Sequence, residues 1–235
     1  MRRLYLLRHA KSSWKDPDLA DPDRPLARRG RGASKAIAGY LREQDIAPEL
    51  VLCSSARRTR ETLERLEPAL GSPTVRIEPE LYAASASTLL ERLRRVPDAV
   101  GSVMLIGHNP GMQDLALDVA RPAPAVRELE LKFPTAALAT LVLQAASWRA
   151  LDRGTAELVD FVRSRDLAGD RAGSQPEPAR SPGRAELLLL GGVLMRRIVS
   201  LRCCRRAAEE ADCDLAHEPV AELGVADARA LVRRR

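Results

Sequence analysis

The sequence predicts an α/β fold of three layers, α/β/α, in which helices cover both faces of a mostly parallel sheet. Three short apolar segments carry this prediction, at residues 4–7, 50–53 and 103–106, because each has the length of a strand and runs into a polar loop. Longer amphipathic segments alternate with them, as expected of crossover units that join parallel strands. The loops that follow such strands meet at one edge of the sheet and form a crevice there.

Four segments in which apolar residues recur at helical spacing are predicted to be helices, namely residues 30–42, 58–70, 88–96 and 112–120. The second ends before the breaker sequence that begins at Gly71, and the third has Ser87 as its predicted N-cap and Pro97 at its end. Further along the chain, alternating or continuous apolar residues predict strands over 129–133 and 138–143, separated by Pro134 and Thr135.

The composition changes near residue 170, which predicts three regions in the 235-residue chain: a domain over 1–168, a linker over 169–184 and an extension over 185–235. The linker is rich in Gly, Pro, Ser and Arg and has almost no large apolar residue. The extension is expected to form short helices. It also holds three cysteines and one histidine, but the adjacent pair Cys203 and Cys204 does not have the usual spacing of zinc ligands, so no metal is expected.

The overall composition favours a cytoplasmic protein without nucleic-acid or membrane partners. The net charge is +6, and the arginines that produce it are spread along the whole chain, so no basic nucleic-acid domain is indicated. Four cysteines are too few for a disulfide framework, which favours a reducing compartment. The longest apolar run, residues 187–195, is far too short to cross a bilayer, and no secretory signal is recognisable.

Histidines and arginines follow the three predicted strands. Arg8 and His9 come directly after the first strand, and His108 follows the third. The loop after the second strand holds three arginines at positions 57, 58 and 60, of which one is expected to be functional. Two guanidinium groups can hold the oxygens of a phosphoryl group, and a histidine can act as the nucleophile that accepts it. The edge of the sheet is therefore predicted to be a phosphate site that carries a nucleophile.

The three loops also resemble a known family. The sequence Leu-Arg-His-Ala around His9, the sequence Ser-Ser-x-x-Arg-Thr-x-x-Thr that starts at Ser54 and the sequence Gly-His-Asn-Pro-Gly around His108 resemble the histidine phosphatase superfamily, which has the phosphoglycerate-mutase-like fold. Within it, residues 7–14, 23–26 and 133–135 are similar to the short SixA-type phosphohistidine phosphatases.

The resemblance implies a role for each residue of the site. His9 would be the phosphorylated nucleophile, Arg8 and Arg58 the phosphate ligands, and His108 a second imidazole that contacts the transferred phosphoryl group. Arg57 is the less favoured second arginine, because the family pattern places the ligand directly before Thr59. Asn109, next to His108, is a further candidate. The family needs no cofactor.

The sequence departs from the superfamily pattern at two positions. Many phosphomonoesterases of the superfamily carry a glutamate as proton donor where this chain has Ala83, and Glu80 is shifted along the chain from that position. Lys15 stands where other branches have a phosphate-binding asparagine. An alkoxide leaves poorly without a proton, whereas the imidazole of a phosphohistidine takes one readily near neutral pH. The missing acid therefore favours a phosphohistidine substrate.

These observations predict a metal-independent phosphatase that acts on protein phosphohistidine through phospho-His9. Metal is not expected because no carboxylate cluster or histidine pair with ligand spacing lies near the predicted site. One alternative is a phosphatase of a small phosphorylated metabolite, with Glu80 or a carboxylate of residues 16–23 as the acid. Another is a phosphate-binding domain without catalysis, whose C-terminal extension contacts a partner.

Overall fold

The structure is a computed structural model that describes residues 1–169 of the chain. The predicted extension over 185–235, its helices and cysteines, and all of the predicted linker after Gly169 lie outside the described residues.

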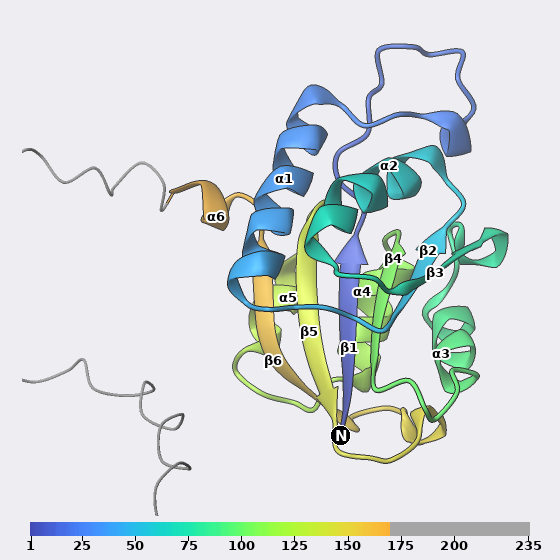
Figure 1. The fold of residues 1–235 in the computed structure, drawn as a ribbon, viewed down its shortest axis with the longest axis vertical. Coiled ribbons are helices and arrows are strands. Elements are labelled where there is room, and N and C mark those ends of the chain that lie inside the picture. Colours follow the sequence, from blue (N-terminus) through green and yellow to red (C-terminus); the bar gives the residue numbers. More distant parts are fainter. Residues whose placement is uncertain (170–235) are drawn as a thin grey trace, which may run out of the picture. The chain divides into compact units, whose positions relative to one another are not determined.

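Six strands form one sheet in the described part of the chain (Figure 1). They are β1 (Arg2–Arg8), β2 (Leu50–Ser54), β3 (Thr74–Glu78), β4 (Ser102–Gly107), β5 (Ala137–Leu143) and β6 (Ala156–Arg163), in the spatial order β3-β2-β4-β1-β5-β6. The pairs β1–β4, β2–β4 and β2–β3 are parallel, and β5 runs antiparallel to both β1 and β6. The prediction of a mostly parallel sheet is therefore confirmed.

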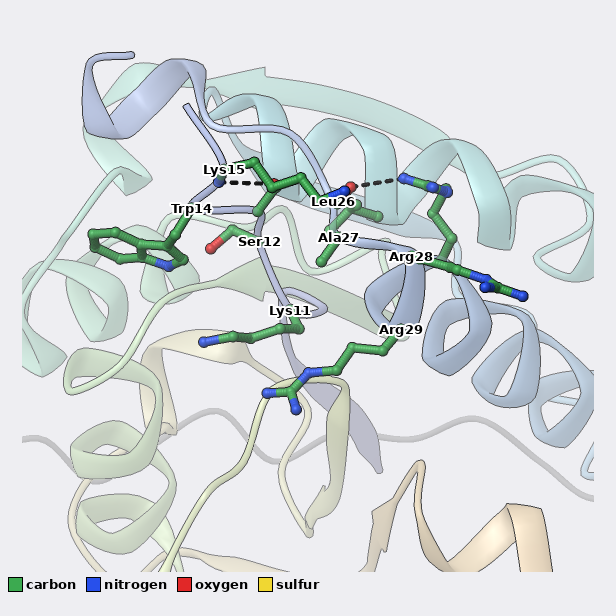
Figure 2. A pocket seen from close by; sticks show the side chains of 10 residues that line it. Lys11, Ser12, Trp14, Lys15, Leu26, Ala27, Arg28 and Arg29 are labelled. Atoms are coloured by element: carbon green, nitrogen blue, oxygen red, sulfur yellow. Dashed lines mark hydrogen bonds between the residues drawn. The ribbon is translucent and has the colours of Figure 1, made fainter. Parts of the chain in front are cut away.

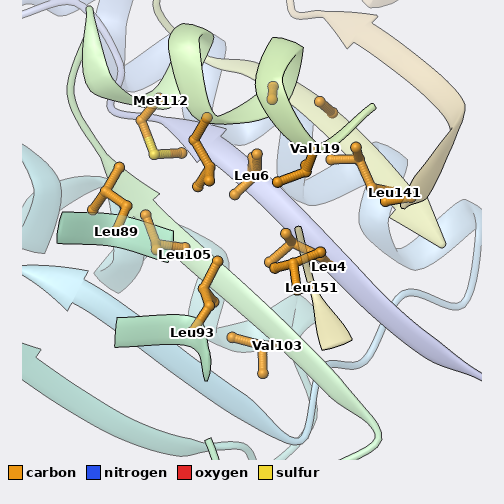
Figure 3. Packing of buried hydrophobic residues seen from close by; sticks show 14 of the residues in the cluster. Leu4, Leu6, Leu89, Leu93, Val103, Leu105, Met112, Val119, Leu141 and Leu151 are labelled. Carbon is orange, nitrogen blue, oxygen red and sulfur yellow. The ribbon is translucent and has the colours of Figure 1, made fainter. Parts of the chain in front are cut away.

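Helices cover both faces of this sheet, which confirms the three predicted layers. They are α1 (Arg28–Glu43), α2 (Arg57–Leu66), α3 (Ala86–Arg94), α4 (Gly111–Val119), α5 (Val126–Leu131) and the short α6 (Asp166–Gly169). One apolar cluster joins alternate strand residues such as Leu4 and Leu6 to α3, α4 and α5 (Figure 3). The other cluster joins the intervening residues, such as Tyr5 and Leu7, to α1 and α2. Strands buried on both faces read as continuous apolar runs, which explains the pattern in the sequence.

Two sequence predictions about these elements are wrong. The segment predicted as a strand over 129–133 begins within α5, because the buried residues Val126 and Leu129 are three positions apart while Leu131 is 86% exposed. Glu and Leu alternate in this segment with the two-residue period of a strand, which explains the wrong prediction. Helix α3 begins at Ala86, and its N-cap is Ser85, whose hydroxyl accepts a hydrogen bond from the Thr88 backbone at 3.2 Å. Ser87 is therefore not the cap.

Candidate active site

The parallel strands β1 and β4 bring the two histidines together. In their register Arg8 lies opposite Gly107, and the backbone N–H of His9 donates to the Gly107 carbonyl at 3.0 Å. The two imidazole ring centroids are 5.0 Å apart. His9 is 7% exposed and His108 6% exposed, so both rings are removed from most of the solvent.

Burial sets the protonation of His9. Its Nδ1 lies 2.7 Å from the Ala10 carbonyl, and because a carbonyl can only accept, Nδ1 carries the proton. Burial lowers the pKa of His9 to about 3, against that hydrogen bond, and the nearby His108, Arg58 and Arg8 lower it further. The ring is therefore neutral at pH 7, and Nε2 has a free lone pair. This is the form that a nucleophile requires.

His108 is held between a serine and an arginine. Its Nδ1 accepts from Arg58 at 3.3 Å, so the proton of the neutral ring is on Nε2, which donates to the Ser54 hydroxyl at 2.8 Å. Burial lowers the pKa of His108 to about 4, and the positive charge of Arg58 acts in the same direction. Ser54 is fully buried at the end of β2 and fixes the orientation of the ring.

Arg58, in the first turn of α2, is the arginine that reaches the histidines. It is 7% exposed, and its guanidinium also donates to the backbone carbonyl and the carboxylate of Asp21, at 2.6 and 2.8 Å. The hydroxyl of Tyr82 donates to the same carboxylate at 2.7 Å, and its ring lies edge-on to His108 with centroids 5.4 Å apart. Hydrogen bonds from Tyr82 and Arg58 hold the pKa of Asp21 below its usual range.

Arg8 is anchored through the backbone of a distant loop. One of its terminal nitrogens donates to the Phe133 carbonyl at 2.7 Å, and its Nε is buried without a hydrogen-bond partner among the described residues. Burial lowers the pKa of Arg8, and repulsion from Arg58 adds to this effect. Two arginines of like charge, one with an unpartnered donor, form a site that an anion would stabilise.

Asn109 and Gly111 hold the loop that carries His108. The Asn109 amide donates to the Phe133 carbonyl at 3.2 Å and to the Gln113 side chain at 3.0 Å. A Cβ at Gly111 would overlap the carbonyl oxygen of Ala84, so only glycine allows α4 to begin this close to the segment after Tyr82. Asn109 is thus placed as a support of the loop, with its Oδ1 buried and unpartnered.

Three other sequence candidates lie apart from this cluster. Arg57 is directed at Glu61, with which it forms a salt bridge of 2.8 Å on the surface of α2. Glu80 is exposed in the 3₁₀ helix Pro79–Leu81, and no hydrogen bond or ion pair joins it to the histidines or arginines. Lys15 is exposed on the loop after β1. The structure therefore brings together Arg8, His9, Arg58 and His108, with Asn109 in support.

Sequence reasoning missed two members of the cluster and only bracketed a third. Tyr82 and Ser54 were not singled out, although Ser54 begins one of the three family-like sequences. Asp21 was one of several carboxylates considered in the loop 16–23, and nothing in the sequence distinguished it from its neighbours. Cys53, at the end of β2, is fully buried, and burial raises the pKa of its thiol to about 12, so it is not a reactive thiolate.

Residues 1–169 contain neither a cluster of potential metal ligands nor a helix that could span a membrane. No group of three or more His, Cys, Asp or Glu side chains is placed to hold a metal ion in this part of the chain. None of the helices described there has the length and hydropathy needed to cross a bilayer.

Comparison with known proteins points to the family that the sequence resembles. The family model of the histidine phosphatase superfamily, branch 1, matches residues 4–98. An uncharacterised protein of Mycobacterium tuberculosis is 37% identical over 159 residues, which cover 66% of this chain and 98% of that protein. The phosphohistidine phosphatase SixA of Escherichia coli is 30% identical over 146 residues, which cover 60% of this chain and 85% of SixA.

The chain belongs to the histidine phosphatase superfamily, and its fold and its relatives support phosphatase activity. Among solved structures it is similar to a protein from Nakamurella multipartitia that was assigned as a phosphohistidine phosphatase SixA. That structure has a TM-score of 0.62 and 30% sequence identity, over 69% of this chain and 95% of the other. Within the superfamily the chain is therefore SixA-like.

Proposed function

We propose that this phosphatase hydrolyses protein phosphohistidine through a covalent intermediate on His9. Nε2 of His9 attacks the phosphorus while Arg8 and Arg58 hold the phosphoryl oxygens. The bond from phosphorus to the substrate imidazole breaks, and that nitrogen keeps the electron pair. An imidazole that already carries a proton on its other nitrogen leaves as the neutral ring.

The second step releases phosphate from His9. Water attacks the phosphorus, Nε2 recovers its electron pair, and the proton of the water passes to the released phosphate or to solvent. The Ala10 carbonyl, 2.7 Å from Nδ1, stabilises the proton on that nitrogen. The phosphorylated ring is therefore held as a cation, which is the better leaving group. His108, whose Nδ1 accepts from Arg58 and whose Nε2 donates to Ser54, helps to hold Arg58 in place beside the phosphoryl group.

The observation that carries this proposal is that the described site has no protonated carboxyl group beside the arginines. The one carboxyl group in contact with Arg58 is Asp21, and its lowered pKa means that it is ionised at pH 7. Glu80 is exposed and has no hydrogen bond or ion pair to the described site, and position 83 is an alanine. A phosphohistidine needs no acid of this kind, whereas the alkoxide of a sugar or glycerate phosphate does.

The same observation weakens the two alternatives. A metabolite phosphatase would need a protonated carboxyl group at the leaving oxygen. The lowered pKa of Asp21 favours its ionised form, and no hydrogen bond or ion pair joins Glu80 to the histidines or arginines of the described site. A domain that only binds phosphate would have no use for a buried, neutral histidine whose Nε2 has a free lone pair. We further propose that the reaction needs no metal, because two guanidinium groups neutralise the phosphoryl charge. A cytoplasmic location stays a prediction from cysteine usage.

A direct comparison of substrates tests the proposal. The full chain is given a phosphohistidine peptide and glycerol phosphate, whose leaving group is an alkoxide, each with and without a chelator of divalent ions. We expect kcat/KM to be at least about 100-fold higher for the peptide, since the alkoxide lacks a proton donor, and we expect the chelator to have no effect. Equal rates on both substrates would contradict the choice of substrate. Loss of activity in chelator, restored by a divalent ion, would contradict metal independence.

A further inference from the structure

A second cationic region lies beside the chain that leaves the nucleophile. The segment directly after His9 and the first turn of α1 enclose a hollow of about 410 Å³ (Figure 2). We call it the cationic hollow, and the side chains that matter in it are Lys11, Trp14, Lys15, Arg28, Arg29 and Arg31. Five of these six are cations, and no Asp or Glu is among the residues that line it.

These cations are unpaired, in contrast to many others in the described chain. Within residues 1–169, no salt bridge involves any of the five, whereas Arg92 pairs with Glu78 at 2.6 Å and Arg57 with Glu61 at 2.8 Å. Arg28 and Arg29 stand in the first turn of α1, where no acidic residue is present and Ala27 offers no side-chain cap. Cations at a helix N-terminus oppose the helix dipole. Arg31 donates to the backbone carbonyl of Leu26 at 2.8 Å, but no carboxylate of the described chain neutralises the charges of the hollow.

A short series of contacts joins the cationic hollow to the active site. Lys11 is two residues from His9, and its carbonyl accepts from the Ala27 backbone at 2.8 Å. At the rim, the guanidinium of Arg24 lies 4.0 Å from the centre of a Trp14 ring, and Arg24 approaches the Asp21 carboxylate at 3.9 Å. Asp21 in turn holds Arg58. A molecule whose phosphoryl group reaches His9 can therefore reach the hollow as well.

The rim also offers an apolar contact. The Trp14 side chain is 64% exposed although it is large and aromatic. Exposed tryptophan next to arginine is typical of surfaces that bind proteins, because both residue types are enriched at the centres of interfaces. The hollow, with five cations spread along two segments, matches several carboxylates on a protein surface better than one small anion.

We propose that the cationic hollow binds acidic side chains of the phosphoprotein substrate while its phosphohistidine occupies the site at His9. This inference rests on the proposed function and adds the feature by which the substrate is recognised. Complementary charge raises the rate of encounter by about 10-fold or more at low salt, and the effect weakens as salt screens it. Recognition of this kind acts on kcat/KM and leaves the chemistry at His9 unchanged.

Two peptides that differ only in charge test the inference. Both carry the same central phosphohistidine, one flanked by four Asp or Glu residues and the other by Asn and Gln at the same positions. The readout is the ratio of their kcat/KM values, which does not depend on how much of each preparation is active. We expect a ratio of about 10 for the natural protein at low salt, falling towards 1 as salt is raised.

Matched variants locate the effect. Replacing two cations of the hollow, R28Q with R29Q, should lower the ratio to about 3 or less, since part of the complementary charge is lost. The control R121Q with R153Q removes the same charge at the end of the sheet that lies opposite the loop carrying His9. The backbone N–H of Arg121 donates to the carbonyl of Ala156 at the start of β6, and Arg153 is in the loop that precedes β6. The control should keep the full ratio, and thermal unfolding verifies that all proteins are folded.

Several results would overturn the inference: a ratio near 1 for the natural protein, an unchanged ratio in R28Q with R29Q, or an equal loss in the control.

If neither peptide is dephosphorylated while p-nitrophenyl phosphate is, the proposed function fails instead. The hollow is then tested by adding the unphosphorylated acidic peptide to the p-nitrophenyl phosphate assay. Inhibition by this peptide but not by its Asn and Gln counterpart supports the surface. Inhibition by inorganic tripolyphosphate alone overturns it in favour of a small-molecule phosphate.

Discussion

The active site and the cationic hollow are both rich in positive charge, but they use it in opposite ways. In the active site, His9, Arg58 and His108 are each less than 8% exposed, and each hydrogen bond fixes one nitrogen. In the hollow, Lys15, Arg28, Arg29 and Arg31 are exposed and have no salt bridge among the described residues. In the active site, burial therefore fixes the protonation state and the geometry of the side chains, as catalysis requires. In the hollow, exposure leaves the cations able to attract a charged partner over a distance.

The largest effect should come from removing the nucleophile. We expect His9→Ala to lower kcat by a factor of about 10⁴ or more, because no other group offers a neutral nitrogen at that position. After a rapid quench, the natural protein should carry phosphate that is labile to acid and stable to alkali, and the variant should carry none. Phosphate recovered on Ser54 or Cys53 would show that the buried histidine is not the nucleophile.

Two neighbouring arginines offer a smaller but sharper test of the same contrast. Arg58→Ala should lower kcat/KM by about 100-fold, since one buried donor to a transferred phosphoryl group contributes roughly 3 kcal/mol. Arg57→Ala should cost about 3-fold or less, because its exposed salt bridge with Glu61 contributes little. The two variants remove the same side chain from adjacent positions of α2. Equal losses would mean that burial does not distinguish them.

The pH dependence of stability is expected to reveal the two buried histidines. Their pKa values are lowered to about 3 and about 4, below the ordinary 6.5, so the unfolded chain binds these protons more tightly than the folded protein. The free energy of unfolding should therefore fall as pH drops from 6.5 towards 4, by about 1.4 kcal/mol per pH unit for each group.

Denaturant unfolding between pH 7 and pH 4.5 measures this slope. In His9→Gln one of the two titrating groups is absent, so the slope should fall to about half. A variant that keeps the full slope would show that carboxylates, and not the active-site histidines, account for the loss of stability in acid.

The parts of the site that could be predicted from the sequence are those fixed by local order. Arg8 and His9 follow a strand directly, and so does His108, so their common edge is set once the strands are parallel. Arg58 was chosen over Arg57 by its place before Thr59. In the structure it is indeed Arg58 that faces His108, while Arg57 turns to the surface. The assignment of their catalytic roles remains a prediction.

The contacts that could not be predicted depend on loops that meet only in the folded chain. Asp21 reaches Arg58 across 37 positions, and Tyr82 reaches Asp21 across 61. No periodicity or spacing encodes such a pairing, because the partners are brought together by the packing of separate segments. The prediction of a strand over 129–133 failed for a different reason. Glu and Leu alternate there over too few residues to distinguish a strand from the helix α5.

The smallest expected effect is that of removing residues 170–235. Among the described residues, the side chains and carbonyls that form the site run from Arg8 to Phe133, and the two apolar clusters extend to residue 167. A chain that ends at Gly169 keeps α6, whose Leu167 packs against the second cluster. Its turnover per folded molecule should therefore be within about 2-fold of the full chain, because the elements that position His9 are retained. The ratio between acidic and neutral peptides should also persist, since the residues that line the cationic hollow belong to α1 and to the segment between β1 and α1. Turnover is measured with the phosphohistidine peptide, and thermal unfolding gives the folded fraction.

A well-folded but inactive fragment would show that the C-terminal part of the chain contributes to the active site. A fragment that is active but has lost the ratio would move substrate recognition from the hollow to the region after residue 169.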